Sequence, residues 1–210
     1  MEAALSSIGV LLGSSWASGV NMYLTMAGLG IASRMHWINL PGDMNAIGNP
    51  LIIFAAIVMY LVEFVADKIP YFDSVWDSVH TFIRPVGGAA LGYMAMANMG
   101  PAAQVPVALL TGGIALNSHL AKATTRAAIN TSPEPFTNSI ASVTEDTAVF
   151  GMLTLIVKHP VIAAFVALVL IAFFVLLIVL MFKFLKKVLG FLFGRGKKEA
   201  PVQAGEKAKA

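Results

Sequence analysis

Residues 73–88 read Asp73-Ser74-Val75-Trp76-Asp77-Ser78-Val79-His80-Thr81-Phe82-Ile83-Arg84-Pro85-Val86-Gly87-Gly88. The ionisable side chains of this stretch recur at intervals of four, three and four residues, which places Asp73, Asp77, His80 and Arg84 on one helical face. Such a face lies either at the headgroup boundary of a membrane, in contact with water, or inside a bundle, where it lines a path for a cation or proton. The sequence leaves both interpretations open.

The whole chain is far more apolar than a soluble protein. Hydrophobic residues make up 58% of its 210 residues and charged residues 12%, whereas soluble domains contain about 45–50% and about 25%. Residues 161–181 form an almost unbroken apolar run, which at about 20 residues is long enough to cross a bilayer. The composition therefore predicts an all-α integral membrane protein.

Several classes of function are not expected. The chain has no cysteine, which excludes disulfides and thiolate metal sites. Its four histidines have no ligand spacing on a shared helix, so neither a metal nor a cofactor is expected. No nucleophile elbow, zinc-protease motif or phosphate loop occurs, so we do not expect an enzyme. Nucleic-acid binding is also not expected, because no aromatic residues alternate with the lysines of the C-terminal tail.

About six hydrophobic segments follow one another along the chain, at residues 8–33, 51–66, 72–97, 105–129, 136–157 and 161–182. The third is interrupted at Arg84-Pro85, and the fifth follows Pro133 and Pro135, so both are predicted to be broken or re-entrant helices. Ser78-Val79-His80-Thr81 also aligns with Ser142-Val143-Thr144-Glu145. This match predicts an inverted repeat with two pseudo-repeated halves, 1–100 and 101–190, within one transmembrane domain at residues 1–190.

Small and polar residues lie in the middle of the first and fourth segments. They allow close helix packing, or else residues 13–19 are partly unwound and line a pathway. Asn21 and Asn117 are the candidate pathway residues of these two segments.

The C-terminal tail, residues 191–210, is basic and expected to be disordered. The positive-inside rule places it in the cytoplasm. If segments three and five both cross, the chain makes six passes, and if both re-enter it makes four. Either count places the N-terminus on the cytoplasmic side as well.

The central motif resembles a known family. Residues 62–70, Val62-Glu63-Phe64-Val65-Ala66-Asp67-Lys68-Ile69-Pro70, together with residues 73–89, are similar to the bacterial membrane family catalogued as domain of unknown function 4126. The resemblance covers most of the chain up to about residue 182. It implies a multi-pass protein of the bacterial inner membrane and a functional role for this motif, but it supplies no substrate.

Ionisable residues inside the apolar segments are the candidate site, because such groups are costly in lipid unless they have a partner or face water. The candidates for a substrate or ion pathway are Asn21, Asp77, His80, Arg84, Asn117, His119, Lys122, Glu145 and Asp146, and those for its mouth are Glu63, Asp67 and Asp73.

Individual roles follow from residue type and position. His80 and His119 are candidates for proton coupling, because histidine titrates near neutral pH. Lys122 is a candidate counter-charge for Asp146. Arg126 is expected to reach the membrane surface along its aliphatic stem.

These features predict a secondary transporter or channel, coupled to a cation or proton. One alternative is binding or translocation of a phospholipid or polyprenyl-phosphate headgroup against Lys122 and Arg126. Another is a noncatalytic adaptor that docks a partner protein on the charged face of residues 73–84. Membrane lipids and a small ion or solute are the expected partners, and a homodimer is plausible for so small a transporter.

Overall fold

The computed structural model describes residues 2–131 and 135–193, and every regular element within those ranges is a helix. The elements are α1 (Glu2–Val20), α2 (Met22–Arg34), η1 (Gly42–Gly48), α3 (Pro50–Ala66), α4 (Phe72–Ala95), η2 (Ala97–Met99), α5 (Pro101–Ile129), α6 (Pro135–Lys158) and α7 (Pro160–Phe193). The predicted all-α class is confirmed for this part of the chain. The predicted basic tail lies outside the described residues from position 194 onward.

Four of the long helices begin at a proline, namely Pro50, Pro101, Pro135 and Pro160. Proline suits the first turn of a helix, because its fixed φ is helical and its missing N–H would have no partner there. In α3 the preceding Asn49 adds a cap, since its side chain accepts a hydrogen bond from the Leu51 N–H at 2.9 Å. The sequence thus sets these helix starts locally.

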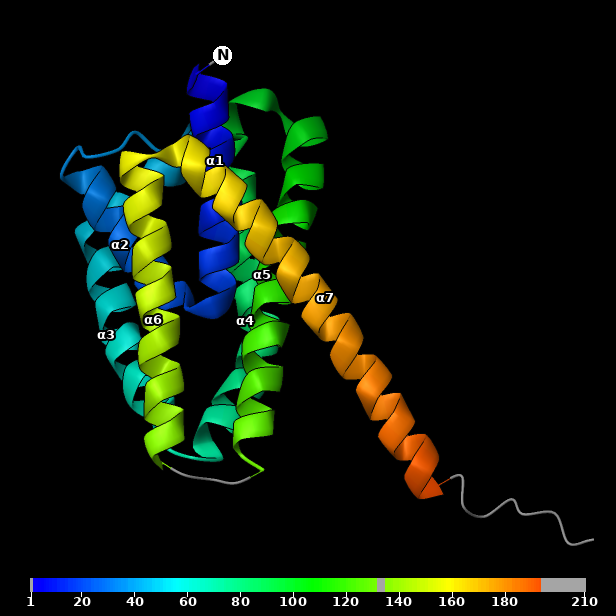
Figure 1. The fold of residues 1–210 in the computed structure, drawn as a ribbon. Coiled ribbons are helices and arrows are strands. Elements are labelled where there is room, and N and C mark those ends of the chain that lie inside the picture. The colour runs from blue at the N-terminus through cyan, green and yellow to red at the C-terminus, as the bar shows by residue number, and fades with distance from the viewer. Residues whose placement is uncertain (1, 132–134, 194–210) are drawn as a thin grey trace, which may run out of the picture.

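Helices α1 and α2 form a hairpin that enters the bundle from one end and turns back inside it (Figure 1). The two outer ends lie together, because Gly9 of α1 packs against Pro160 while Ile31 and Ala32 of α2 share a pocket with Val157. At the tip, Asn21 leaves the helical conformation and accepts a hydrogen bond from Leu24 N–H at 2.9 Å. Asparagine is a favoured N-cap, so it ends one helix and starts the next.

This hairpin corrects the expected positions of the breaks. Segments three and five were predicted to be broken or re-entrant, but α4 and α6 are each continuous, and α4 runs through Pro85. A proline removes only one backbone hydrogen bond, and tight packing against α5 holds α4 in place around it. The turn inside the bundle belongs to the first segment instead. Residues 13–19 are helical and tightly packed, so the packing interpretation of that stretch is correct.

Small residues bring α1, α4 and α5 into close contact. A methyl group added at Gly19 would collide with the Ala115 carbonyl and the Ser118 hydroxyl, and one added at Gly92 would collide with Thr111. Gly112 of α5 lies against the Pro85 carbonyl. Close backbone approach of this kind is the usual way in which membrane helices associate.

Helices α3 to α6 run alternately down and up the bundle, and α7 crosses its flank and extends beyond it (Figure 1). Within the described residues, two helices are long and apolar enough to cross a membrane, α6 and residues 160–184 of α7. The pair of η1 and α3, bent by 70°, makes a third if it counts as one span. The structure is therefore compatible with a membrane protein, whereas the predicted count of six segments and the two repeated halves stay predictions.

Candidate functional site

Eight ionisable side chains from α3, α4, α5 and α6 meet inside the bundle. They form what we call the charge cluster: Glu63, Asp67, Asp73, Asp77, Arg84, Lys122, Arg126 and Glu145. All are buried except Glu145, whose side chain is 16% exposed. Glu63 and Asp67, predicted to lie at a pathway mouth, are 0% and 2% exposed and belong to the cluster itself.

Arg84 lies at the end of the cluster nearest the α1–α2 hairpin. Its guanidinium donates to Glu63 Oε1 at 2.5 Å and to the Gly19 carbonyl at 2.8 Å. The backbone at the end of α1 thus helps to position this cation. The charged face of α4 consequently points inward, which decides against the headgroup-boundary interpretation.

Lys122 lies among four carboxylates. Its ammonium is 2.7 Å from Asp67, 3.3 Å from Glu63, 3.5 Å from Glu145 and 4.0 Å from Asp77. Asp146 is not among its ion-pair partners, so the expected counter-charge role of Lys122 for Asp146 is limited to an electrostatic interaction at longer range. Lys122 is thus a shared counter-charge for carboxylates from α3, its C-cap, α4 and α6.

Arg126 is fully buried, which corrects the expectation that it reaches the membrane surface. It makes two hydrogen bonds to Glu145, at 2.6 and 3.1 Å, and donates to the Asp67 and Asn138 carbonyls. A planar guanidinium suits such two-point binding of a carboxylate. Partners on α6 and at the C-cap of α3 therefore retain this cation inside the bundle.

Asp77 differs from the other acids of the cluster because neither of its carboxylate oxygens accepts a hydrogen bond from residues 2–131 or 135–193, although the side chain is only 2% exposed. Its nearest cations, Arg84 and Lys122, are 3.6 and 4.0 Å away. The cluster contains five carboxylates and three cations, so full ionisation would leave a formal charge of −2 inside the bundle. Buried net charge is costly, and such groups normally take up a proton or a counter-ion.

The two candidate histidines are held by hydrogen bonds that fix their tautomers. His119 Nε2 lies 3.0 Å from the Asp77 carbonyl, which can only accept, while its Nδ1 lies 2.9 Å from the Arg84 guanidinium, which can only donate. His119 is therefore neutral, and a second proton would face a cation. His80 Nδ1 donates to the Trp76 carbonyl at 2.8 Å, and its Nε2 contacts the Tyr23 hydroxyl.

A second polar site lies at the tip of the α1–α2 hairpin. Asn21 donates to Asp146 Oδ1 at 2.9 Å, and the Tyr60 hydroxyl donates to Asp146 Oδ2 at 3.2 Å. The sequence neighbours Glu145 and Asp146 thus belong to different sites. Glu145 is part of the charge cluster, whereas Asp146 binds the hairpin tip. Asp146 lies half-way along α6, so the hairpin turns at mid-length of the bundle.

An amide network closes the end of the cluster near the α3–α4 turn. Asp73 accepts from Asn130 at 2.7 Å, and Asn138 donates to the Asn130 side-chain oxygen at 3.0 Å.

We did not predict Asn130, Asn138, Tyr23 or Tyr60 from the sequence. Two signals in the sequence could have identified them: Asn130 and Asn138 are polar residues that flank a turn, and Tyr23 and Tyr60 are tyrosines in apolar helices. Asn117, which was predicted, instead donates to the Ile171 carbonyl of α7.

No group of three or more His, Asp or Glu side chains in the described part of the chain is arranged to hold a metal ion.

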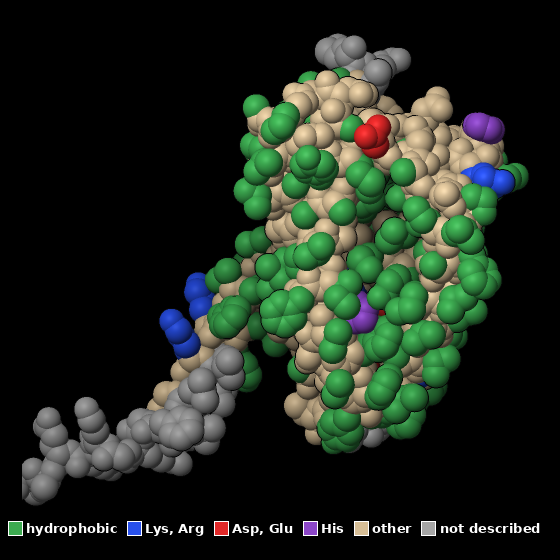
Figure 2. Space-filling view, turned by 180° about the vertical axis from the view of Figure 1, so that it is seen from behind, with side chains coloured by type: hydrophobic (Ala, Val, Ile, Leu, Met, Phe, Trp, Pro, Cys, Tyr) green, Lys and Arg blue, Asp and Glu red, His purple; other side chains and the backbone are tan. Residues whose placement is uncertain are grey.

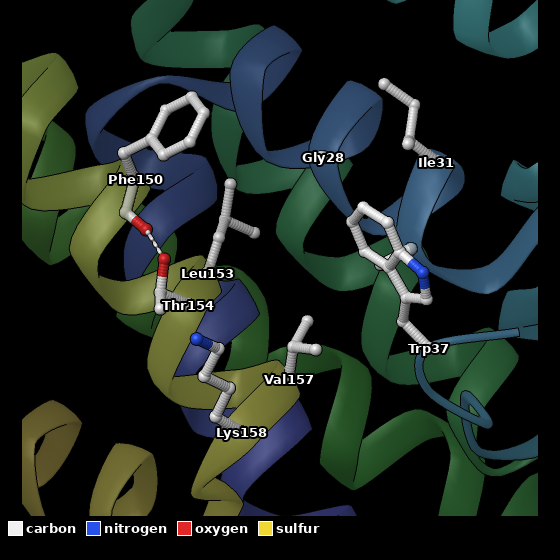
Figure 3. A pocket seen from close by; sticks show the side chains of 9 residues that line it. Gly28, Ile31, Trp37, Phe150, Leu153, Thr154, Val157 and Lys158 are labelled. Carbon is white, nitrogen blue, oxygen red and sulfur yellow. Dashed lines mark hydrogen bonds between the residues drawn. The ribbon is translucent and has the colours of Figure 1, made fainter. Parts of the chain in front are cut away.

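A separate pocket of about 240 Å³ lies between α2 and α6. Figure 3 shows its apolar lining, with Trp37 on one side and Phe150 and Leu153 on the other, and Lys158 near its edge. Because it gathers few polar groups, it offers less chemistry than the charge cluster.

Comparison with known proteins identifies the family. The family model described as "Domain of unknown function (DUF4126)" matches residues 8–180. The chain belongs to this family. No curated protein and no solved structure shows a significant match. The matched range of the DUF4126 model contains the whole charge cluster and the α1–α2 hairpin from residue 8 onward, including its tip at Asn21.

Proposed function

We propose that this DUF4126 protein is an integral membrane protein whose helical bundle lies across a bilayer. Seven of the eight side chains of the charge cluster are buried while many large apolar side chains are exposed, the reverse of a soluble protein. In α4 the charged face points inward, whereas Val75, Val79, Phe82 and Val86 are exposed. Figure 2 shows hydrophobic side chains over most of the visible bundle surface and few charges. Lipid accounts for such a surface.

The arrangement of helices supports a revised topology. We retain the proposal of a bacterial inner membrane and a cytoplasmic basic tail. The N-terminal end of α1 and the far end of α7 lie toward opposite ends of the bundle (Figure 1). We therefore propose that the α1–α2 hairpin re-enters, that α3 to α7 cross, and that the N-terminus faces the other side from the tail. The inverted repeat and the homodimer stay predictions.

Within that membrane, we propose that the protein moves a small cation, most simply a proton, as a transporter or channel and not as an enzyme. The observation that carries this proposal is Asp77, a buried carboxylate without a hydrogen-bond donor in a cluster with more acids than bases. A proton on Asp77 would neutralise this carboxylate and reduce the formal charge of the cluster from −2 to −1. Repeated protonation and release at this position would move charge through the bundle.

The two alternatives have less support. A phosphate headgroup would need free cations, but Lys122 and Arg126 are buried and already paired with carboxylates. An adaptor would need the charged face of α4 to be accessible, but Asp73, Asp77 and Arg84 are 0–2% exposed. Both alternatives would require these helices to separate.

A flux assay tests the proposal. The purified protein is reconstituted into liposomes containing a pH-sensitive dye, and a potassium diffusion potential drives protons inward. We expect faster acidification than in protein-free vesicles, and the Asp77→Asn variant should reduce the rate to that of the empty vesicles. Asp43→Asn is the matched control, because Asp43 lies in η1 and is exposed.

Two results would overturn the proposal. One is an Asp77→Asn variant that conducts at the wild-type rate. The other is a wild-type protein that, tested in turn with proton, sodium and potassium gradients, never exceeds empty vesicles. Elution volume and thermal midpoint in detergent show whether the variant is folded, so that a lost flux is not mistaken for a lost fold.

A further inference from the structure

A groove of about 370 Å³ lies between α3 and α6 and is separate from the charge cluster. It is lined by Tyr60, Phe64, Val143, Asp146, Thr147 and Phe150, and we call it the Asp146 groove. Val143, Thr147 and Phe150 are exposed, so the groove opens on the flank of the bundle and not at its end. In the proposed membrane orientation, this flank faces lipid at mid-depth.

We propose that the Asp146 groove binds a lipophilic organic cation that enters from the bilayer. Its single acidic group is Asp146, and its other lining residues are aromatic, aliphatic or a threonine. This binding site is separate from the proposed proton path at Asp77, and its ligand is an organic cation.

Charge complementarity is the first argument for a cation. Asp146 is half-buried, and its two oxygens accept hydrogen bonds only from the neutral groups of Asn21 and Tyr60. The ion pairs of the described residues include Glu145 but not Asp146. Lys68 and Lys122 act on Asp146 only from beyond ion-pair distance. A carboxylate on an apolar flank without a cation in contact is costly, and a bound cation would supply that contact.

The aromatic lining is the second argument. Tyr60 and Phe64 lie with their ring centres 6.0 Å apart, and Phe150 lines the same groove. Ring faces attract cations, most strongly where water is excluded. The ammonium of Lys68 already lies 2.9 Å from the centre of the Phe64 ring, so the rings left for a bound cation are those of Tyr60 and Phe150.

The opening of the groove selects for a lipophilic cation. An inorganic cation would arrive with its hydration shell, and the exposed apolar lining would not replace those water ligands. A cation that carries aromatic or aliphatic groups would place them against Val143 and Phe150 and its charge near Asp146. The volume of the groove lies within the range of about 300–1,000 Å³ that is typical of small-molecule sites.

Equilibrium binding of radiolabelled tetraphenylphosphonium to the purified protein in detergent tests this inference. We expect saturable binding to the wild type and binding weaker by at least about tenfold in Asp146→Asn, because a desolvated charge partner is lost. Asp43→Asn should bind as the wild type does. Neutral triphenylphosphine oxide should not compete, since it has a similar shape without the charge.

A second pair of variants separates a lost site from a lost fold. Val143→Trp should fill the groove and abolish binding without removing the carboxylate. Ile140→Trp is its control, because Ile140 is also exposed on α6 but does not line the groove. Asp77→Asn should bind tetraphenylphosphonium normally, so a failed flux assay leaves this inference standing.

The inference is overturned if the wild type shows no saturable binding, if Asp146→Asn and Asp43→Asn bind equally well, or if the neutral compound competes fully. In the first two cases a proton is the better occupant of Asp146. In the third, the groove binds apolar molecules without regard to charge.

Discussion

Glu63 of α3 and Arg84 of α4 form an ion pair of 2.5 Å in which both side chains are 0% exposed. The pair joins two helices that are consecutive in the sequence. Because α4 packs in turn against α5, the pair connects α3 to the core of the bundle. The same Glu63 oxygen also lies 3.3 Å from Lys122, so one carboxylate serves cations from two helices.

Removing one member of this pair should destabilise the protein strongly. We expect Glu63→Gln to lower the free energy of unfolding by about 1–3 kcal/mol, because Arg84 would lose its closest charged hydrogen-bond partner while Asp77, 3.6 Å away, remains as a counter-charge. Thermal unfolding in detergent, followed by intrinsic fluorescence, measures the effect. The double variant Glu63→Gln/Arg84→Met should lose less than the two single changes together, since it leaves no unpaired partner. Strict additivity would show that the pair is not coupled.

The hairpin tip offers a second prediction, because two asparagine caps can be compared. Asn49→Ala should cost about 1 kcal/mol, the usual value for a lost N-cap. Asn21→Ala should cost about 1–3 kcal/mol more, because it also removes a donor from Asp146. Hydrogen exchange should be faster in the first turn of α2. Equal losses for the two variants would mean that the Asn21–Asp146 bond contributes nothing.

Two glycines provide a third test. Gly19→Ala should destabilise the protein by about 1–3 kcal/mol, because the new methyl group would meet the Ala115 backbone carbonyl, which cannot move freely. Gly113→Ala, with open space around it in the interior of α5, should be neutral or stabilise by up to about 1 kcal/mol. The thermal midpoint of Gly19→Ala should therefore fall, whereas that of Gly113→Ala should stay unchanged or rise. A stable Gly19→Ala protein would contradict the close approach of α1 and α5.

The absence of native cysteine allows a direct test of the proposed topology. Single cysteines are placed at Asp43 in η1, at Tyr71 in the α3–α4 turn and at Lys183 near the far end of α7, and are labelled in intact cells with an impermeant maleimide. We expect labelling of Asp43→Cys and protection of the other two, because η1 and the α3–α4 turn lie at opposite ends of the bundle (Figure 1). Equal labelling of Asp43→Cys and Tyr71→Cys would refute five crossings.

Much of the candidate site was predictable from residue type. Ionisable residues in apolar segments were expected to face one another, and Asp77, Arg84, Lys122 and Glu145 do meet in one cluster. Their helical spacing was informative because a helix fixes which side chains share a face. The spacing could not indicate what each face would contact, so the burial of Arg126 and the full set of carboxylates around Lys122 were not predicted.

The position of the re-entrant turn was harder to predict. Arg84-Pro85 was a stronger local signal for a break than Val20-Asn21, yet α4 continues and the chain turns at Asn21. Contacts with α5 compensate for the hydrogen bond that Pro85 lacks, and the bond from Asn21 to Asp146 favours the turn. Both effects involve residues more than 25 positions away in the sequence, so no local pattern contains them.

The sequence by itself determined the helical class, the proline starts of four helices, the apolar exterior and the charged face of α4, because each depends on residues within a few turns of one another. Only the tertiary structure decided that five carboxylates meet three cations, that Asp77 is left without a donor and that α1 and α2 turn back at mid-length. Those features depend on helices brought together by small residues and buried charge, and the free energy of such contacts belongs to the assembled bundle.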